Sequence, residues 1–144
     1  MYHGIGSPIS FHGGPVMDNR SSLWLKQAQG ENKWAKDAFG SGNWALVCFL
    51  CQQTSEKALK AIAFSMGVTQ VRSHSTFEIA ESLGINGELA DASRILDQYY
   101  MTTRYPDALP GGVPCEMFVK SQAEEALRLA ELFLLRARAE LDDG

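Results

Sequence analysis

The strongest constraint on this chain is the helical period of its apolar residues, which recurs over long segments without strand-like alternation. Apolar residues spaced three or four positions apart line one face of a helix, whereas strict alternation of apolar and polar residues indicates a strand. We therefore expect an all-α protein whose helices cover residues 21–39, 43–66, 76–83, 88–104 and 114–141.

Glycine, asparagine and proline residues mark the ends of these helices. A Gly-Ser-Gly turn at 40–42 separates the first two helices, and Asn43 is a favourable cap for the second. Gly67 suits the position just after a helix, and Pro114 suits the first position of the last helix. Because most connections are short, the sequence predicts an up-and-down antiparallel four-helix bundle with an additional short helix.

The first 18 residues differ in composition from the rest of the chain. They are rich in Gly, Pro and Ser and lack the basic start and apolar core of a secretory signal. We predict a flexible tail or upstream coding sequence over residues 1–18, with Met17 as an alternative start, and one helical domain over residues 19–144. His3 and His12 lie nine residues apart in this tail, which is a poor metal site, and neither a metal nor a cofactor is predicted.

Charge and composition limit the classes of partner. The chain has 144 residues and a net charge of −4, which argues against strong sequence-independent binding to nucleic acid but leaves a local basic patch possible. No apolar run approaches the ~20 residues that a membrane helix needs. The odd number of cysteines, three, and the lack of a signal favour the reducing cytoplasm.

Cys48 and Cys51 form a C-x-x-C motif inside the second predicted helix. A thioredoxin-type site would open a helix after a strand, and a zinc site would need two further ligands, for which only His74 and Cys115 are at hand. The motif therefore predicts two small residues on a packed helix face rather than a redox or metal centre.

The polar block QQTSEKALKA, Gln52–Ala61, interrupts the same helix. Glu56 and Lys60 lie four residues apart with the acid first, which is the spacing of an ion pair on a helix surface. In the alternative interpretation, Gln52, Gln53, Glu56 and Lys60 form a polar ridge that faces a ligand or a partner. The spacing alone leaves both interpretations open.

Two further groups of residues invite a functional interpretation. His74 stands just before the short third helix, where it could act as a switch or a base, or could fix the loop through a hydrogen bond. The stretch YYMTTRYPD ends the fourth helix, since the residue before a proline avoids helical angles. Arg104 in that last turn complements the helix dipole, or is held by Glu56, or is presented to a phosphate with Tyr105 beside it.

Taken together, these segments resemble the HEPN domain family. The resemblance is carried by QQ-x-x-EKALKA, by His74 before the third helix and by Y-x-x-x-RYPD, and it extends from about Ser21 to Arg138. It implies a compact up-and-down helical bundle, usually dimeric, that is associated with nucleotide binding and often accompanies a small nucleotidyltransferase. Many members are ribonucleases of toxin–antitoxin or defence systems.

One departure from the family pattern bears on catalysis. The ribonuclease members carry an arginine followed four to six residues later by a histidine, late in the bundle. The histidines of this chain are His3, His12 and His74, so none follows Arg104. The resemblance therefore favours a non-catalytic member, although it leaves open whether the protein is an enzyme.

The leading interpretation is a cytoplasmic, homodimeric HEPN-like protein that binds a nucleotide or RNA, or assists a small nucleotidyltransferase in a toxin–antitoxin-like setting. Its binding residues are expected to be Glu56, Lys57, Lys60, His74, Arg104 and Tyr105. Glu56 would orient Arg104, one of the two lysines would meet phosphate, and Tyr105 would stack on a base. Two alternatives remain, a helical dimerisation or interaction module without a ligand, and a ribonuclease with a non-standard site in which His74 and Arg104 meet.

Overall fold

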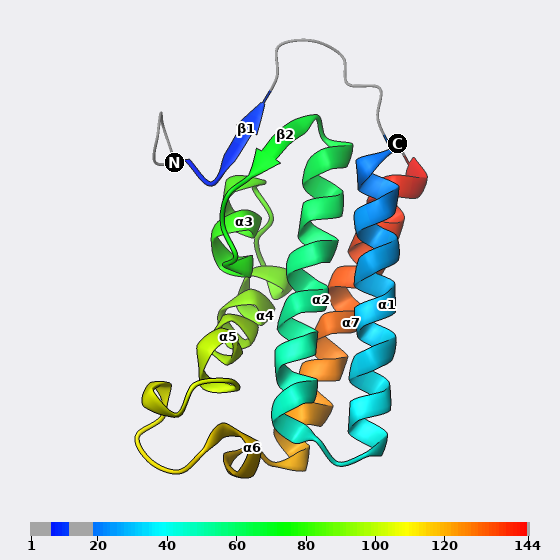
Figure 1. The fold of residues 1–144 in the computed structure, drawn as a ribbon. Coiled ribbons are helices and arrows are strands. Elements are labelled where there is room, and N and C mark those ends of the chain that lie inside the picture. The colour runs from blue at the N-terminus through cyan, green and yellow to red at the C-terminus, as the bar shows by residue number, and fades with distance from the viewer. Residues whose placement is uncertain (1–6, 12–18, 144) are drawn as a thin grey trace.

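Three long helices make up most of the fold. The computed structural model describes residues 7–11 and 19–143 of the chain. Within them, α1 (Arg20–Gly40), α2 (Trp44–Ser65) and α7 (Lys120–Asp143) lie along one another, and α2 contacts both of the others (Figure 1). The prediction of a mainly helical protein is confirmed, and no helix in the described part of the chain is long and apolar enough to cross a membrane.

The turn between α1 and α2 makes them an antiparallel hairpin. Gly42 adopts a φ of +76°, a left-handed conformation that glycine reaches without the steric cost of a side chain. The amide of Asn43 donates to the carbonyl of Ala38 at 3.0 Å, so the carbonyls at the end of α1 are satisfied within the turn. The turn therefore sets α1 alongside α2, and the two helices are in contact.

The predicted fourth helix over residues 88–104 is interrupted. It is divided into α4 (Glu88–Asp97) and α5 (Tyr99–Thr102), and a 3₁₀ turn (Pro106–Ala108) follows. The amide of Gln98 bonds to the carbonyl three residues earlier, which tightens the helix at this point. The break belongs to a short-helix layer in which α3 (Thr76–Ser82) packs on α4 beside α2.

The predicted last helix is also divided. Pro114 is the first residue of a helix, as expected, but that helix is the short α6 (Pro114–Met117). Phe118 then adopts an extended conformation, and α7 begins at Lys120. The Phe118 side chain is buried against the ring of Tyr99, so burial of one aromatic residue accompanies the break.

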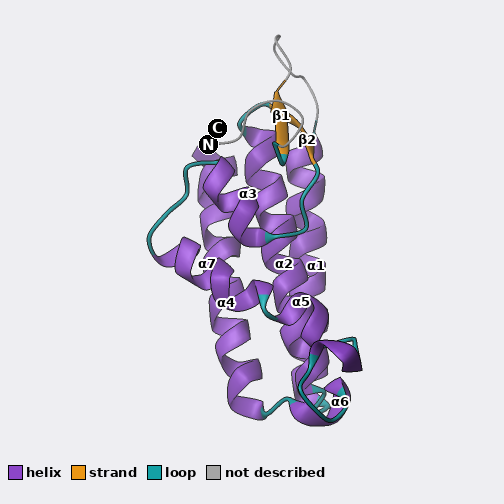
Figure 2. Ribbon diagram, turned by 90° about the vertical axis from the view of Figure 1, so that its left-hand side faces the viewer, coloured by secondary structure: helices purple, strands orange, loops and turns teal. Residues whose placement is uncertain are grey.

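A two-stranded antiparallel sheet at one end of the helices was not predicted from the sequence. Strand β1 (Ile9–Phe11) pairs with β2 (Val68–Val71), as Figure 2 shows in orange. Strands of three and four residues are too short to show a recognisable alternation. Part of the predicted flexible tail is therefore a strand, whereas residues 1–6 and 12–18 lie outside the described residues.

Helix α2 is the most enclosed element of the described chain. Its buried positions include apolar residues such as Leu59 and Ile62, which pack with Phe133 of α7 and Ile79 of α3 in one core. The same helix buries a set of polar side chains, namely Gln52, Thr54, Ser55, Glu56 and Lys60. Polar groups are costly to bury without partners. All of these side chains except Thr54 form hydrogen bonds, which identify the polar centre of the molecule.

Candidate ligand-binding site

The buried carboxylate of Glu56 is the centre of the polar group on α2. Its Oε2 accepts from Lys60 Nζ at 2.7 Å and lies 3.1 Å from Nδ1 of His74, while its Oε1 accepts from Gln53 at 3.4 Å. Both Glu56 and Lys60 are nearly inaccessible to solvent. The predicted ion pair at this spacing is therefore confirmed, but it lies inside the protein rather than on a helix surface.

Glu56 also determines how His74 presents its ring. A carboxylate can only accept, so the Nδ1 that faces it is the donor, and Nε2 of the neutral ring is left as an acceptor. The His74 side chain is 64% exposed, and its ring stacks on Tyr100 at 5.9 Å with an interplanar angle of 11°. His74 is thus held by a buried carboxylate while most of its side chain remains exposed.

Arg104 is surrounded by aromatic rings at the surface. Its guanidinium carbon lies 4.5 Å from the ring centroid of Phe49, 4.7 Å from that of Tyr100 and 5.1 Å from that of Tyr105. Nε and Nη2 both donate to the carbonyl of Tyr100, which holds the side chain over the last turn of α5. Among the described residues no carboxylate forms an ion pair with Arg104. We refer to Phe49, His74, Tyr100, Arg104 and Tyr105 as the Tyr100 site.

The structure brings only some of the predicted residues together. His74 and Arg104 contact the same ring, that of Tyr100, and Tyr105 lies beside Arg104. The expected contact between Glu56 and Arg104 is not formed, because the Glu56 carboxylate is taken up by Lys60 and His74.

The two lysines on α2 are engaged in ion pairs. Lys57 Nζ lies 2.9 Å from the carboxylate of Glu31 on α1, and Lys60 is paired with Glu56. Both side chains are largely buried, whereas Arg104 is exposed. The binding of a ligand by these residues stays a prediction.

Sequence reasoning overlooked the role of Asp97. Its carboxylate accepts from the amides of Thr76 and Phe77, and from the hydroxyls of Ser75 and Thr76, and so holds the first turn of α3. It also accepts from Gln52 at 3.3 Å. The sequence did not predict the contact between Asp97 and the start of α3, because Asp97 and Thr76 are some twenty residues apart.

An open pocket of about 370 Å³ adjoins Tyr100. It is lined by Ser73, His74, Ser75, Glu78, Asp97 and Tyr100. Three segments supply these residues, namely the loop before α3, α3 itself and the α4–α5 break. The pocket is within the size range of small-ligand sites, roughly 300–1,000 Å³.

The sequence profile of the HEPN domain family matches residues 21–139, which include the whole Tyr100 site. The chain belongs to the HEPN domain family. No curated protein matches it. Strand β1 lies outside the matched residues, whereas β2 lies within them.

Solved structures agree with this assignment. TT1696 from Thermus thermophilus is 35% identical, with a TM-score of 0.79, and the match covers 85% of this chain and 99% of TT1696. ST0689, an archaeal HEPN homologue, is 29% identical with a TM-score of 0.71, over 85% of this chain and 98% of the other. The HEPN domain protein TM0613 from Thermotoga maritima is 27% identical with a TM-score of 0.67, over 83% and 98%.

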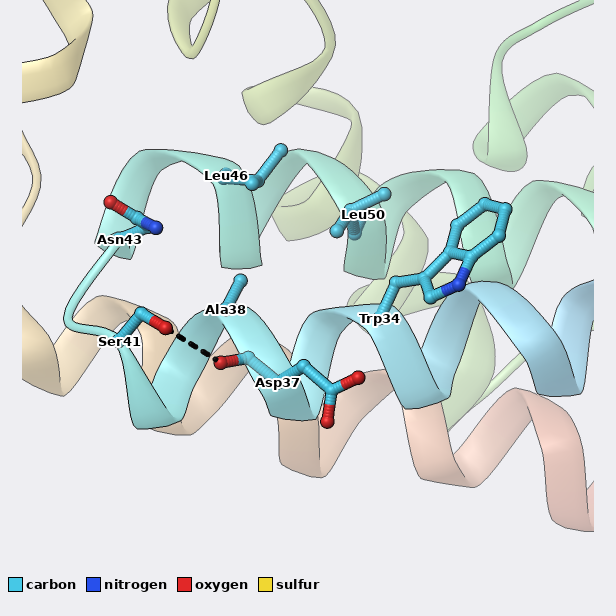
Figure 3. A pocket seen from close by; sticks show the side chains of 7 residues that line it. All are labelled: Trp34, Asp37, Ala38, Ser41, Asn43, Leu46 and Leu50. Carbon is cyan, nitrogen blue, oxygen red and sulfur yellow. Dashed lines mark hydrogen bonds between the residues drawn. The ribbon is translucent and has the colours of Figure 1, made fainter.

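A second pocket, of about 430 Å³, lies between α1 and α2 of this HEPN domain. In Figure 3 Trp34 reaches from α1 toward α2, where Leu46 and Leu50 stand, and Ser41 and Asn43 lie at the turn. Trp34 is 55% exposed and Leu46 is 46% exposed. The groove therefore exposes two large apolar side chains to solvent.

The C-x-x-C motif is part of the packed core. Cys48 and Cys51 are fully buried free thiols, which confirms that they are small core residues, whereas Cys115 is exposed. Burial, with a smaller contribution from Glu125, raises the pKa of Cys48 to about 12, and burial also raises the pKa of Cys51. Thiols held in the protonated form are poor nucleophiles and poor metal ligands.

We expect the free energy of unfolding to fall as pH rises from about 9 to about 12. The pKa of Cys48 is raised from 9.0 to about 12, and burial raises the pKa of Tyr99 from 10.0 to about 12. Groups with raised folded-state pKa values stabilise the fold fully below their unfolded values and lose this contribution as pH approaches the folded ones.

Urea unfolding at pH values across this range measures the slope. Cys48→Ala should flatten the fall, while Cys115→Ala, at the exposed cysteine, should leave the wild-type slope. Identical slopes for the two variants would show that burial of Cys48 does not produce the effect.

Proposed function

We propose that this HEPN protein binds a nucleotide or a short stretch of RNA at the Tyr100 site. The observation that carries the proposal is Arg104, an exposed guanidinium held over the rings of Phe49, Tyr100 and Tyr105. An arginine without a carboxylate partner can donate two parallel hydrogen bonds to a phosphate.

The aromatic rings supply the other half of the binding surface. Tyr105 is 47% exposed, and unpaired bases stack on aromatic side chains or guanidinium planes. Each stacked base contributes about 1–3 kcal/mol. In this proposal Tyr105 receives a base and Arg104 receives the phosphate, while Glu56, Lys57 and Lys60 support the site without touching the ligand.

The charge of the protein fits a short ligand. Its net charge is −4, and the two nearby lysines are already paired, so few phosphates can be neutralised. Binding that involves one or two phosphates depends only weakly on salt concentration. A mononucleotide or the end of an RNA chain suits this surface better than a long duplex.

We further propose a homodimer that forms through the groove between α1 and α2. Trp34, Leu46 and Leu50 give this groove an apolar surface, and the groove is separate from the pocket beside Tyr100. HEPN domains often dimerise. The family resemblance extends the proposal to a cytoplasmic role beside a small nucleotidyltransferase, in a toxin–antitoxin-like setting, for which the neighbouring gene is the direct test.

A ribonuclease is the second candidate because His74 and Arg104 contact the same Tyr100 ring. Nε2 of His74 would take the proton of a ribose 2′-hydroxyl, whose oxygen attacks the adjacent phosphorus. The bond from phosphorus to the 5′-oxygen then breaks, a 2′,3′-cyclic phosphate forms, and the imidazolium returns the proton to the 5′-oxygen. Arg104 would stabilise the charge on the phosphoryl group.

Arg104→Ala is expected to weaken binding of AMP and of a short single-stranded RNA by about tenfold or more, because a charge-assisted pair with phosphate is lost. Isothermal titration calorimetry measures this. Arg136→Ala, at an exposed arginine on α7, is the matched control and should bind like the wild type. If the wild type binds neither ligand at millimolar concentration, the proposal is wrong. If Arg104→Ala instead loses thermal stability or dimerisation without any effect on ligands, an interaction module is the better description.

Leu46→Glu is expected to shift the protein from dimer to monomer in analytical ultracentrifugation, since it places a charge in the apolar groove. Leu135→Glu is the control, because Leu135 is similarly exposed, at 54%, but lies on α7 outside the groove. A wild-type protein that is monomeric at all concentrations, or equal disruption by both variants, would rule out this interface.

The ribonuclease is tested by incubating the wild type with RNA and looking for products that end in a 2′,3′-cyclic phosphate. His74→Ala should abolish cleavage, whereas Glu81→Gln, at an exposed acid on α3, should not change it. RNA that remains intact with the wild type excludes this candidate and leaves binding as the function.

A further inference from the structure

We propose that the pocket beside Tyr100 selects ribonucleotides by their hydrogen-bond donors, and that Nε2 of His74 is the group that reads them. This inference rests on the proposed function, since it concerns the ligand of the same site. It adds an orientation, in which the donor-bearing part of the nucleotide enters the pocket and the phosphate stays at Arg104.

The hydroxyl hydrogens of the two serines that line the pocket are already used. The Ser73 hydroxyl donates to Glu78 at 2.6 Å and accepts from the amide of Ser75. The Ser75 hydroxyl donates to Asp97 at 2.7 Å and accepts from the amide of Glu78. Neither serine therefore retains a hydrogen to donate to a ligand.

Apart from the Tyr100 hydroxyl, the remaining capacity of the pocket is for accepting hydrogen bonds. Glu56 lies 3.1 Å from Nδ1 of His74, which is therefore the donor, so Nε2 of the neutral ring is an acceptor. The His74 side chain is 64% exposed. The carboxylate of Glu78 is a second acceptor in the pocket lining. The Tyr100 hydroxyl is the one lining group that can both donate and accept.

Charge excludes the phosphate from this pocket. Glu78 and Asp97 both line it, and like charges repel at short range. Arg104, by contrast, offers only donors, and its guanidinium lies 4.7 Å from the centroid of the Tyr100 ring. A ligand with a phosphate at one end and neutral donors at the other satisfies both neighbours of Tyr100.

A ribonucleotide has these two ends. Its donors are the ribose hydroxyls and, in adenine, the exocyclic amine, and the 2′-hydroxyl is the group that distinguishes RNA from DNA. A cationic side chain from a peptide would also donate hydrogen bonds in the pocket, but it carries no phosphate and would leave Arg104 without an anion. The pocket of about 370 Å³ has room for the nucleoside part of such a ligand.

Glu56 is a positioning residue in this scheme because it acts through His74. Its effect is visible in the protonation pattern of the imidazole ring. In nitrogen-detected NMR spectra of the free protein at pH 8, where imidazoles are usually neutral, His74 should carry its proton on Nδ1. A proton on Nε2 would make the ring a donor and would overturn the proposal.

The ligand test compares AMP with 2′-deoxy-AMP and with purine riboside 5′-monophosphate, which lacks the amine. The wild type should bind AMP at least about fivefold more tightly than it binds one or both analogues, because loss of one hydrogen bond lowers affinity by about this factor. Loss of affinity on removal of the 2′-hydroxyl assigns the contact to ribose, and loss on removal of the amine assigns it to the base.

His74→Phe keeps a ring that can stack on Tyr100 but removes Nε2. We expect it to bind AMP and the weaker analogue about equally, and Glu81→Gln to keep the wild-type preference. Equal binding of all three nucleotides by the wild type, or an unchanged preference in His74→Phe, would overturn donor selection while leaving nucleotide binding in place. Failure of the wild type to bind any of them would overturn the proposed function as well.

Discussion

The polar residues of α2 and the loop before α3 depend on one buried carboxylate, that of Glu56. It pairs with Lys60 and lies against His74. Moving a carboxylate and an ammonium out of water is costly, and well-packed apolar residues often stabilise a core as much as a buried ion pair does. Stability alone is therefore a weak reason for such a pair. The pair instead orients His74. Lys60 offsets the charge of Glu56, and the second contact of Glu56 fixes Nδ1 of His74.

A second carboxylate holds the neighbouring segment in place. Asp97 accepts from two amides and two hydroxyls at the start of α3. The loop that carries His74 is therefore held by Glu56 through the His74 ring and by Asp97 through the residues that follow. Gln52 connects the two carboxylate centres, since it donates to Asp97 and to the carbonyl of His74, and accepts from Gln53. The polar block on α2 is thus part of a continuous hydrogen-bonded network that ends at an exposed imidazole.

The sequence predicted what depends on local spacing. The first three helical segments, the turn at Gly42 and the pair of Glu56 with Lys60 all follow from residues within a few positions of one another. Contacts between distant segments were not accessible in this way. Lys57 pairs with Glu31 of α1. Arg104 is held by the carbonyl and ring of Tyr100 rather than by Glu56 as predicted. The aromatic surroundings of Arg104 likewise depend on Phe49, which lies on a different helix.

The small sheet has a consequence for how the protein behaves in a concentrated solution. A free strand edge is a template for pairing with other chains, and natural proteins blunt such edges with short strands, irregular register and charge. Here β2 is paired with β1, the pairing is irregular between Ser10 and Phe11, and the guanidinium of Arg72 binds the carbonyl of Ser7. Strand β1 therefore closes one edge of β2, and its three-residue length with a shift in register leaves little regular edge on which an aggregate could grow.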